Sequence, residues 1–241
     1  MRILLTNDDG IGAAGLAALE AAFGSRHEVW VVAPDGERSG TSHAIHLQGP
    51  VRIRHEGERR FSCSGTPADC VFLGLRGDFL PSIDAVLSGI NHGPNLGTDV
   101  VYSGTCAAAR QGALAGMPSV AVSLASFHQP FDFDTGARWL AEHWEKAVTS
   151  CRAGHFVNIN LPGKPVLPLA GHSAIPSVRK YFDKVVTFTD PRGDQHCFVE
   201  GLIRDDEIPD DSDWGLVRRG CVALSLMVAQ PTAAPWIGGT W

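Results

Sequence analysis

The chain opens with a short apolar run that leads into two adjacent carboxylates. Residues 2–5 (Arg-Ile-Leu-Leu) predict a buried strand, and the polar stretch 6–12 follows it as a turn. Apolar residues at helical spacing over 16–23 then predict a helix. Strand, turn and helix in this order indicate the first unit of a parallel α/β sheet. Asp8 and Asp9 therefore lie at the carboxyl end of its first strand, which is where such sheets bind ligands.

The alternation of strands and helices continues over most of the 241 residues. We expect further strands at 29–33, 85–87, 120–122 and 157–161, helices at 67–75, 106–114 and 133–151, and a β-hairpin within 46–64. Thr66 is the expected N-cap of the helix that begins at Pro67. This rhythm predicts a mostly parallel, doubly wound sheet covered by helices on both faces.

The pattern changes beyond Lys164. Two β-rich segments, 185–189 and 197–200, flank Asp190-Pro191-Arg192-Gly193-Asp194 and predict a long hairpin, which is followed by a short helix at 214–219 and a strand at 220–227. We expect a single domain with these parts: an α/β core over 1–177, a hairpin arm over 178–203, a returning helix and strand over 204–227, and an irregular tail over 228–241.

Composition restricts the function classes. The formal net charge of −6 and the pI near 5.9 argue against binding to a nucleic acid polymer. The six cysteines are scattered without a C-x-x-C pair, so we expect reduced thiols in the core. The first residues lack the pattern of a signal peptide, and no apolar run reaches the roughly 18–20 residues of a membrane helix. We therefore expect a cytoplasmic protein without a membrane partner.

Polar residues follow several of the predicted strands. The loops in question carry Asp8 and Asp9, Ser39, Asn91 with Asn95, and Ser103-Gly104-Thr105. Carboxyl ends of parallel strands meet at one edge of the sheet, so we expect these loops to converge. Two unit charges about 4 Å apart near a surface repel by roughly 4 kcal/mol, and a bound cation would reverse that effect. Carboxylate, hydroxyl and amide oxygens suit Mg²⁺, Mn²⁺ or Ca²⁺ rather than Zn²⁺.

Each of these residues also has a purely structural interpretation. Asp8 or Asp9 alone is a common helix N-cap, and Ser39 or Ser103 alone is a common turn or cap residue. Asn91 and Asn95 tolerate left-handed backbone conformations, and Arg38 is either a phosphate ligand or a surface charge. The residues alone therefore indicate a metal-dependent enzyme or a binder of a phosphorylated small molecule. Free N–H groups at Gly104 and Thr105 would suit the phosphate.

A glycine pattern indicates a different function. Gly10-x-Gly12-x-x-Gly15 after a strand matches the dinucleotide-binding fingerprint, with Asp35 near the position of a ribose-binding acid. By pattern alone, an NAD-dependent dehydrogenase is an alternative. Electrostatics count against it, because a pyrophosphate at this helix N-terminus would meet the charges of Asp8 and Asp9.

Five ordered blocks of sequence give a more specific signal. They are Thr6-Asn7-Asp8-Asp9-Gly10; Val32-Ala33-Pro34-Asp35 with Glu37-Arg38-Ser39-Gly40; Gly65-Thr66-Pro67-Ala68-Asp69-Cys70; Ser88-Gly89-Ile90-Asn91 through Asn95-Leu96-Gly97 to Tyr102-Ser103-Gly104-Thr105; and Asn158-Ile159-Asn160-Leu161-Pro162. With these blocks the chain resembles the SurE (survival protein E) family of nucleotidases from Met1 to about Met227. It departs from that pattern at Cys106, at Gln111 and in the tail after Met227.

The resemblance implies a Rossmann-like sheet with a protruding hairpin arm that reaches a partner subunit in a homodimer or homotetramer. It implies one divalent metal ion per subunit, held by Asp8, Asp9, Ser39 and Asn91. It also implies phosphate contacts from Asn95 and the Ser103-Gly104-Thr105 turn. The implied activity is hydrolysis of nucleoside 5′-monophosphates to nucleoside and phosphate, with side activity on 3′-nucleotides or polyphosphate in some members.

The mechanism and the class of function stay open at this point. Metal-bound water is the preferred attacking group for phosphomonoester hydrolysis, and Asp8 as a covalent nucleophile or general base is the alternative. A non-catalytic nucleotide sensor would use the same pocket as the enzyme. The dehydrogenase would instead bind NAD without added metal.

Overall fold

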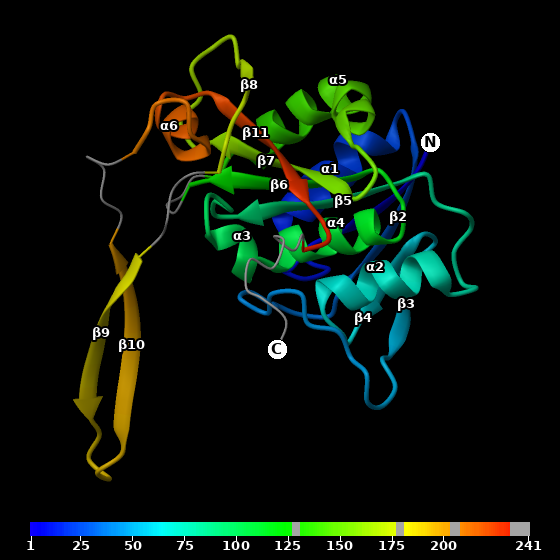
Figure 1. The fold of residues 1–241 in the computed structure, drawn as a ribbon. Coiled ribbons are helices and arrows are strands. Elements are labelled where there is room, and N and C mark those ends of the chain that lie inside the picture. Colours follow the sequence, from blue (N-terminus) through cyan, green and yellow to red (C-terminus); the bar gives the residue numbers. More distant parts are fainter. Residues whose placement is uncertain (127–130, 177–180, 203–207, 232–241) are drawn as a thin grey trace, which may run out of the picture.

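The computed structural model describes residues 1–126, 131–176, 181–202 and 208–231, and for 181–183 and 200–202 it describes the backbone only. Its centre is a nine-stranded sheet with the order β3-β4-β2-β1-β5-β6-β7-β11-β8, and a two-stranded hairpin arm stands apart from it (Figure 1). The sheet consists of β1 (Arg2–Thr6), β2 (Glu28–Pro34), β3 (Ile53–Gly57), β4 (Arg60–Cys63), β5 (Ala85–His92), β6 (Ser119–Ala125), β7 (His155–Pro162), β8 (Gly171–Ser173) and β11 (Val222–Val228).

The predicted mostly parallel α/β sheet is confirmed. Strands β4, β2, β1, β5, β6 and β7 run parallel to one another, while β11 pairs antiparallel with β7 and β3 pairs antiparallel with β4. The chain runs outward from β1 through β2 to β4 and then returns to β5 on the other side of β1. The strand order thus reverses between β1 and β5, and the crevice at such a switch point is the usual ligand site of this architecture.

Helices cover both faces of the sheet. The helices are α1 (Ala14–Gly24), α2 (Pro67–Arg76), α3 (Asp99–Tyr102), α4 (Gly104–Leu114), α5 (Phe133–Ser150) and α6 (Asp213–Arg218). Helices α1 and α5 share one buried apolar cluster with alternate residues of the central strands, while α2 and α4 pack together on the opposite face (Figure 1). A Cβ at Gly15 would lie 2.0 Å from the carbonyl oxygen of Ile90, so glycine lets α1 lie directly on β5.

The expected helix starts follow from their caps. Thr66 caps α2 in a capping box with Asp69, and Pro67 occupies the first turn, as predicted. Asp132 caps α5, whose observed bounds lie within one residue of the predicted helix. No helix in the described part of the chain is long and apolar enough to cross a membrane.

Some elements differ from the predictions. The hairpin expected within 46–64 is confined to β3 and β4, and the preceding residues form an irregular loop. The sequence analysis missed α3 and β8, which are four and three residues long and too short for a periodic signal. All six cysteines are free, and Cys63, Cys70 and Cys106 are buried, whereas Cys197 is exposed and is not a core thiol.

The second predicted hairpin is confirmed as an arm. Strands β9 (Tyr181–Thr189) and β10 (Gln195–Leu202) pair antiparallel in a sheet of their own, and the arm extends away from the body (Figure 1). Asp190 closes the turn by accepting hydrogen bonds from the N–H groups of Arg192 and Asp194. Residues 204–207 of the returning segment and most of the predicted tail lie outside the described residues. The division of the chain into four parts stays a prediction.

Candidate active site

A tight turn after β1 sets the direction of the two adjacent carboxylates. The Asn7 side chain donates to the carbonyl oxygen of Gly10 (2.9 Å) and accepts from its N–H (3.2 Å). Gly10 has a φ of +102°, a conformation that favours glycine. The turn therefore places Asp8 and Asp9 beyond the end of β1, beside the crevice between β1 and β5.

Asp8 lies at the start of helix α4. Its carboxylate accepts a hydrogen bond from the Thr105 hydroxyl, and its side chain is only 3% exposed. A Cβ at Gly104 would lie 2.8 Å from the Asp8 Cβ, so the contact depends on glycine at the first position of the helix. Burial raises the pKa of Asp8 above its ordinary value, although hydrogen bonds from the hydroxyl and N–H of Thr105 oppose the shift.

Asp9 points toward the end of β5. Its carboxylate accepts a hydrogen bond from the His92 N–H at 3.3 Å. Burial, then the neighbouring charge of Asp8, and more weakly that of Glu37, raise the pKa of Asp9 to about 6. The surroundings of both aspartates thus disfavour the negative charge, and a nearby cation would favour it.

Ser39 and Asn91 are in the neighbouring loops. The Arg38 N–H donates to the Asp8 carbonyl oxygen (2.7 Å), which joins the loop after β2 to the turn after β1. The exposed Ser39 hydroxyl donates to Glu37 (3.0 Å). Asn91 follows an irregularity in the pairing of β5 with β6. Its side-chain nitrogen donates to the Gly93 carbonyl oxygen (2.9 Å), so its Oδ1 is the atom that could bind a metal ion.

The donor set is chemically suited to a hard cation. Within the described ranges, no group of three or more His, Cys, Asp or Glu side chains is placed to hold a metal. A metal at this edge therefore needs the hydroxyl and amide oxygens in addition to the two carboxylates. That composition fits Mg²⁺, Mn²⁺ or Ca²⁺, which take oxygen ligands and keep positions for water and phosphate.

The predicted phosphate-binding residues lie at the start of α4 and in the loop after β5. Ser103 is the N-cap of α4 and its hydroxyl accepts from the Cys106 N–H (3.0 Å). The N–H groups of Gly104 and Thr105 are at the positive end of this helix, which favours anions. Asn95 is buried, and its side-chain amide donates to the Ser123 hydroxyl (2.8 Å). The roles of these residues stay predictions.

Comparison with known proteins identifies the family of this fold. The family model described as Survival protein SurE matches residues 3–183. The chain belongs to the SurE family. A protein named 5′-nucleotidase SurE from Anaeromyxobacter sp. (strain K) is 47% identical over 216 residues, which is 87% of this chain and 82% of the relative. One of the same name from Synechococcus sp. (strain JA-3-3Ab) is 41% identical over 97% of this chain and 93% of the relative.

A solved SurE structure agrees over nearly the whole chain. The crystal structure of the Sure protein from Aquifex aeolicus has a TM-score of 0.86 and 31% identity, and it covers 96% of this chain and 95% of that protein. The predicted family resemblance and fold are thereby confirmed.

In this SurE-family chain the glycine pattern serves local structure. Gly10 makes the turn, Gly15 packs α1 on β5, and a Cβ at Gly12 would meet no atom within 4 Å. Asp35, the candidate ribose ligand, is instead ion-paired with Arg38 (2.8 Å) and Arg52 (3.4 Å). Arg38 is thus held at the edge of the site by Asp35.

Loop histidines with described side chains have structural partners. His43 contacts Gln111 (2.8 Å), and His46 contacts Asp69 (2.6 Å) next to the cap of α2. His92 packs edge-on against Phe131, with ring centroids 4.0 Å apart. His128 lies outside the described residues.

The sequence analysis missed part of the surroundings of the site. Asn158 and Asn160 on β7 and Ser123 on β6 are buried and all hydrogen-bond to Asn95. Glu37 was also missed, although it bonds Ser39 and contributes to the raised pKa of Asp9. The signal for the asparagines was available: two amides alternate with apolar residues in a strand that is otherwise core.

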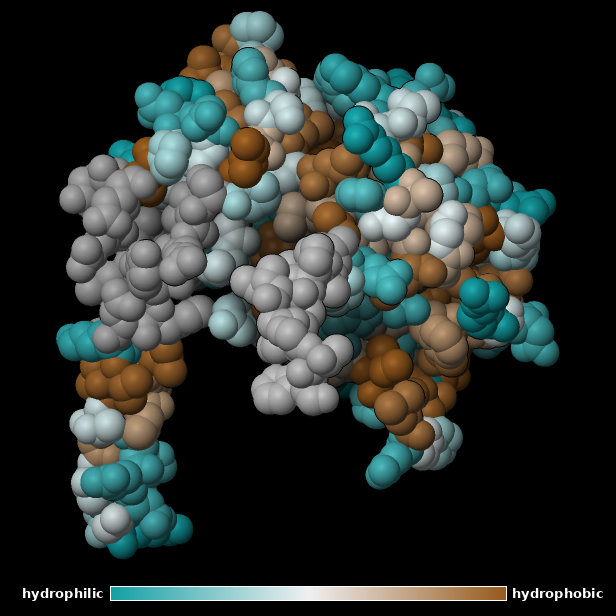
Figure 2. Space-filling model, in the orientation of Figure 1, coloured by the Kyte–Doolittle hydropathy of each residue, from teal (hydrophilic) through white to brown (hydrophobic). Residues whose placement is uncertain are grey.

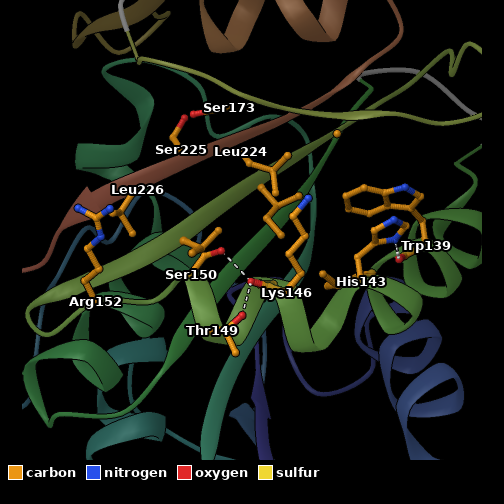
Figure 3. A pocket seen from close by; sticks show the side chains of 15 residues that line it. Trp139, His143, Lys146, Thr149, Ser150, Arg152, Ser173, Leu224, Ser225 and Leu226 are labelled. Carbon is orange, nitrogen blue, oxygen red and sulfur yellow. Dashed lines mark hydrogen bonds between the residues drawn. The ribbon is translucent and has the colours of Figure 1, made fainter.

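A cavity of about 490 Å³ lies elsewhere in the SurE-family fold (Figure 3). Its wall combines α5 with β7, β8 and β11, including Trp139, Lys146, Arg152, Ile159 and Leu226. None of the predicted site residues lines it, and Arg152 stands before the amino end of β7. The carboxylates and the α4 N-terminus converge instead at the carboxyl edge of the sheet, away from this cavity.

Proposed function

We propose that this chain is a metal-dependent phosphomonoesterase that hydrolyses nucleoside 5′-monophosphates to nucleoside and phosphate. Membership of a family whose relatives are named 5′-nucleotidase SurE supports the enzyme class. The observation that carries the proposal is the contact between a buried carboxylate and the N-terminus of a helix, made by Asp8 and Thr105. In this proposal it combines groups for a cation and for a phosphate at the switch point of the sheet.

In this proposal one divalent metal ion per subunit is held by Asp8, Asp9, Ser39 and Asn91. When bound, Mg²⁺, Mn²⁺ or Ca²⁺ would polarise a phosphate oxygen and offset charge that develops during phosphoryl transfer. The Ser39 hydroxyl donates its hydrogen to Glu37, so the lone pairs of its oxygen remain for the ion, and the side chain is exposed.

The protein groups would bind and orient the phosphate. Asn95 and the turn of Ser103, Gly104 and Thr105 would donate hydrogen bonds to its oxygens, where negative charge increases in the transition state. For this contact the Thr105 N–H would turn from the Asp8 carboxylate to the phosphate. Thr105 fixes the orientation of Asp8, the residue that we propose as catalytic. Water is the attacking group in this proposal, and a trapped phosphoaspartate would instead establish Asp8 as the nucleophile.

Phosphate release from a nucleotide panel tests the function directly. We expect the purified chain to release inorganic phosphate from AMP or GMP with Mn²⁺ or Mg²⁺, and EDTA to abolish the release. The panel includes 3′-nucleotides and polyphosphate, which the proposal assigns as side substrates. Binding of AMP without phosphate release under any of these metals would indicate a nucleotide sensor and contradict the enzyme.

The hairpin arm suggests how subunits associate. Val185, Phe188, Phe198 and Val199 are each about half exposed or more, and Figure 2 shows hydrophobic surface on the arm. A lone two-stranded hairpin is marginally stable in water, so its apolar residues need a partner. The proposal therefore includes a homodimer or homotetramer in which the arm packs on a second copy.

Light scattering after size exclusion checks this association. We expect the double variant Phe188→Ser, Phe198→Ser to lower the oligomeric mass relative to the unchanged chain, because both rings lie on the exposed face of the arm. Both substitutions lie in the arm and outside the nine-stranded sheet, so far-UV circular dichroism should remain unchanged. An unchanged mass would contradict a role for the arm.

The proposal also places the protein in the cytoplasm. Six cysteines without a disulfide are typical of a reducing compartment. Cell fractionation with an antibody against the chain would contradict this placement if the protein appeared in the periplasm or the medium.

A further inference from the structure

Two buried asparagines lie on a central strand of the sheet. Asn158 is 0% and Asn160 is 1% exposed, on β7 between β6 and β11. Their neighbours Val157 and Ile159 point to the other face, into the apolar cluster beneath α5. A buried amide without hydrogen bonds destabilises a fold by about 1–3 kcal/mol. The hydrogen-bond partners of these two side chains therefore need to be identified.

Both side chains bind the main chain of one residue. Asn160 accepts from the Asn95 N–H (2.8 Å) and donates to the Asn95 carbonyl oxygen (3.0 Å). Asn158 donates to the same carbonyl oxygen (2.9 Å). The N–H and the carbonyl oxygen of Asn95 are thus both hydrogen-bonded to side chains of the central sheet.

The same group of contacts fixes the Asn95 side chain. Its Nδ2 donates one hydrogen to the Ser123 hydroxyl on β6 (2.8 Å). An amide nitrogen carries two hydrogens, so the second is available to an acceptor such as a phosphate oxygen. Ser123 therefore determines the direction in which the remaining donor points.

A further contact joins this group to helix α4. The Cys106 thiol donates to Asn158 Oδ1 at 3.5 Å, and the Cys106 N–H is bound by the capping hydroxyl of Ser103. Burial raises the pKa of Cys106 to about 12, so the sulfur remains a protonated donor. Asn158 thus contacts both the Asn95 loop and the first turn of the helix that begins with Gly104 and Thr105.

We propose that Asn158 and Asn160 are positioning residues that align the two phosphate-binding elements, the Asn95 loop and the start of α4, for the transferred phosphoryl group. This inference rests on the proposed phosphomonoesterase function. Four of the five hydrogen bonds in the group end on Asn95, and the fifth ends on the helix that carries the other predicted phosphate contacts. The asparagines act through Asn95 and are not themselves in contact with substrate.

The test is a double-mutant cycle on kcat/KM for AMP hydrolysis. Asn160→Leu keeps the branching of the asparagine side chain, with a methyl group in place of each amide heavy atom, and removes both bonds to Asn95. We expect it to lower kcat/KM by about 10- to 100-fold, because misplacement of a binding group by about 1 Å has effects of that size. In Asn95→Ala the donor is already gone, so adding Asn160→Leu should cause less than about a twofold further loss.

A matched control separates positioning from general core damage. Ser225 pairs with Asn158 across β11 and β7 and is 2% exposed, so Ser225→Ala also removes a buried polar group beside the same strand. We expect kcat/KM of Ser225→Ala to remain within about twofold of the unchanged chain. If Asn160→Leu does not fold, Ser123→Ala replaces it in the cycle, with an expected loss of about three- to tenfold and the same lack of additivity.

The outcomes are distinct. The positioning role would be overturned if Asn160→Leu retained its kcat/KM. It would also be overturned if Asn160→Leu lowered kcat/KM by the same factor in Asn95→Ala as in the unchanged chain. If the unchanged chain releases no phosphate, the proposed function fails and amide hydrogen exchange decides the inference instead. Exchange of residues 93–98 should then be roughly tenfold faster in Asn160→Leu than in Ser225→Ala, and equal rates would overturn the inference.

Discussion

Asp8→Asn is expected to lower kcat/KM for AMP hydrolysis by about 10³-fold or more and to weaken Mn²⁺ binding in parallel. The substitution keeps the shape of the side chain and the acceptor for the Thr105 hydroxyl, but it removes a negative charge from the proposed metal site. Steady-state phosphate release and calorimetric Mn²⁺ titration measure the two effects. Asp35→Asn is the matched control, since Asp35 lies in the neighbouring loop and pairs with Arg38.

Removing the neighbouring charge at Asp9 is expected to stabilise the fold at high pH when no metal is present. Since the pKa of Asp9 is raised to about 6 in the fold, the folded chain takes up protons that the unfolded chain does not. In EDTA the contribution of Asp9 to stability is therefore full below about pH 4 and is lost as pH rises through 6. The melting temperature of Asp9→Asn should exceed that of the unchanged chain at pH 8 and not at pH 4. A lower melting temperature of Asp9→Asn at pH 8 in EDTA would show that the carboxylate stabilises the fold without a cation.

Gly104→Ala is expected to lower kcat/KM by about 10²-fold. A Cβ at this position would lie 2.8 Å from the Asp8 Cβ, 2.9 Å from its Oδ2 and 3.1 Å from the Pro67 Cγ. Contacts under 3.0 Å cannot persist, so the carboxylate or the start of α4 has to move. Phosphate-release kinetics report the result, and a change below threefold would contradict the close contact.

Gly12→Ala is the control for this variant and also tests the glycine fingerprint. The added methyl group would meet nothing within 4 Å, so activity should be unchanged. In a dinucleotide-binding protein the corresponding glycine allows the pyrophosphate to approach the backbone. NAD binding that is lost in Gly12→Ala would therefore support the dehydrogenase alternative.

The fold could be predicted where local signals are strong and agree with the tertiary structure. The α2 start is an example, because Thr66 and Pro67 are favourable at consecutive positions of a helix N-terminus and the residues that follow have helical spacing. The antiparallel placement of β11 beside β7 could not be predicted, since it depends on a long excursion through the arm. Elements as short as α3 and β8 are held by packing and carry no periodic pattern.

The site could be predicted only in part. Parallel strands bring their carboxyl ends together, which is why residues as far apart in sequence as Asp8 and Thr105 were expected at one edge and are in contact. This reasoning predicts the edge of the sheet at which the residues meet, but not the hydrogen bonds that they form there. It could not predict that the Ser39 hydroxyl binds Glu37 or that β7 supplies two amides to the Asn95 main chain. These contacts depend on side-chain orientations that the sequence pattern does not specify.

The measurement closest to the central claim is anomalous diffraction from crystals of the chain grown in Mn²⁺. Our account predicts one strong manganese peak per subunit, coordinated by Asp8, Asp9, Ser39 and Asn91, and no such peak in Asp8→Asn crystals. Ordinary water at that position, with the Asp8 and Asn91 side chains turned away from each other, would contradict it.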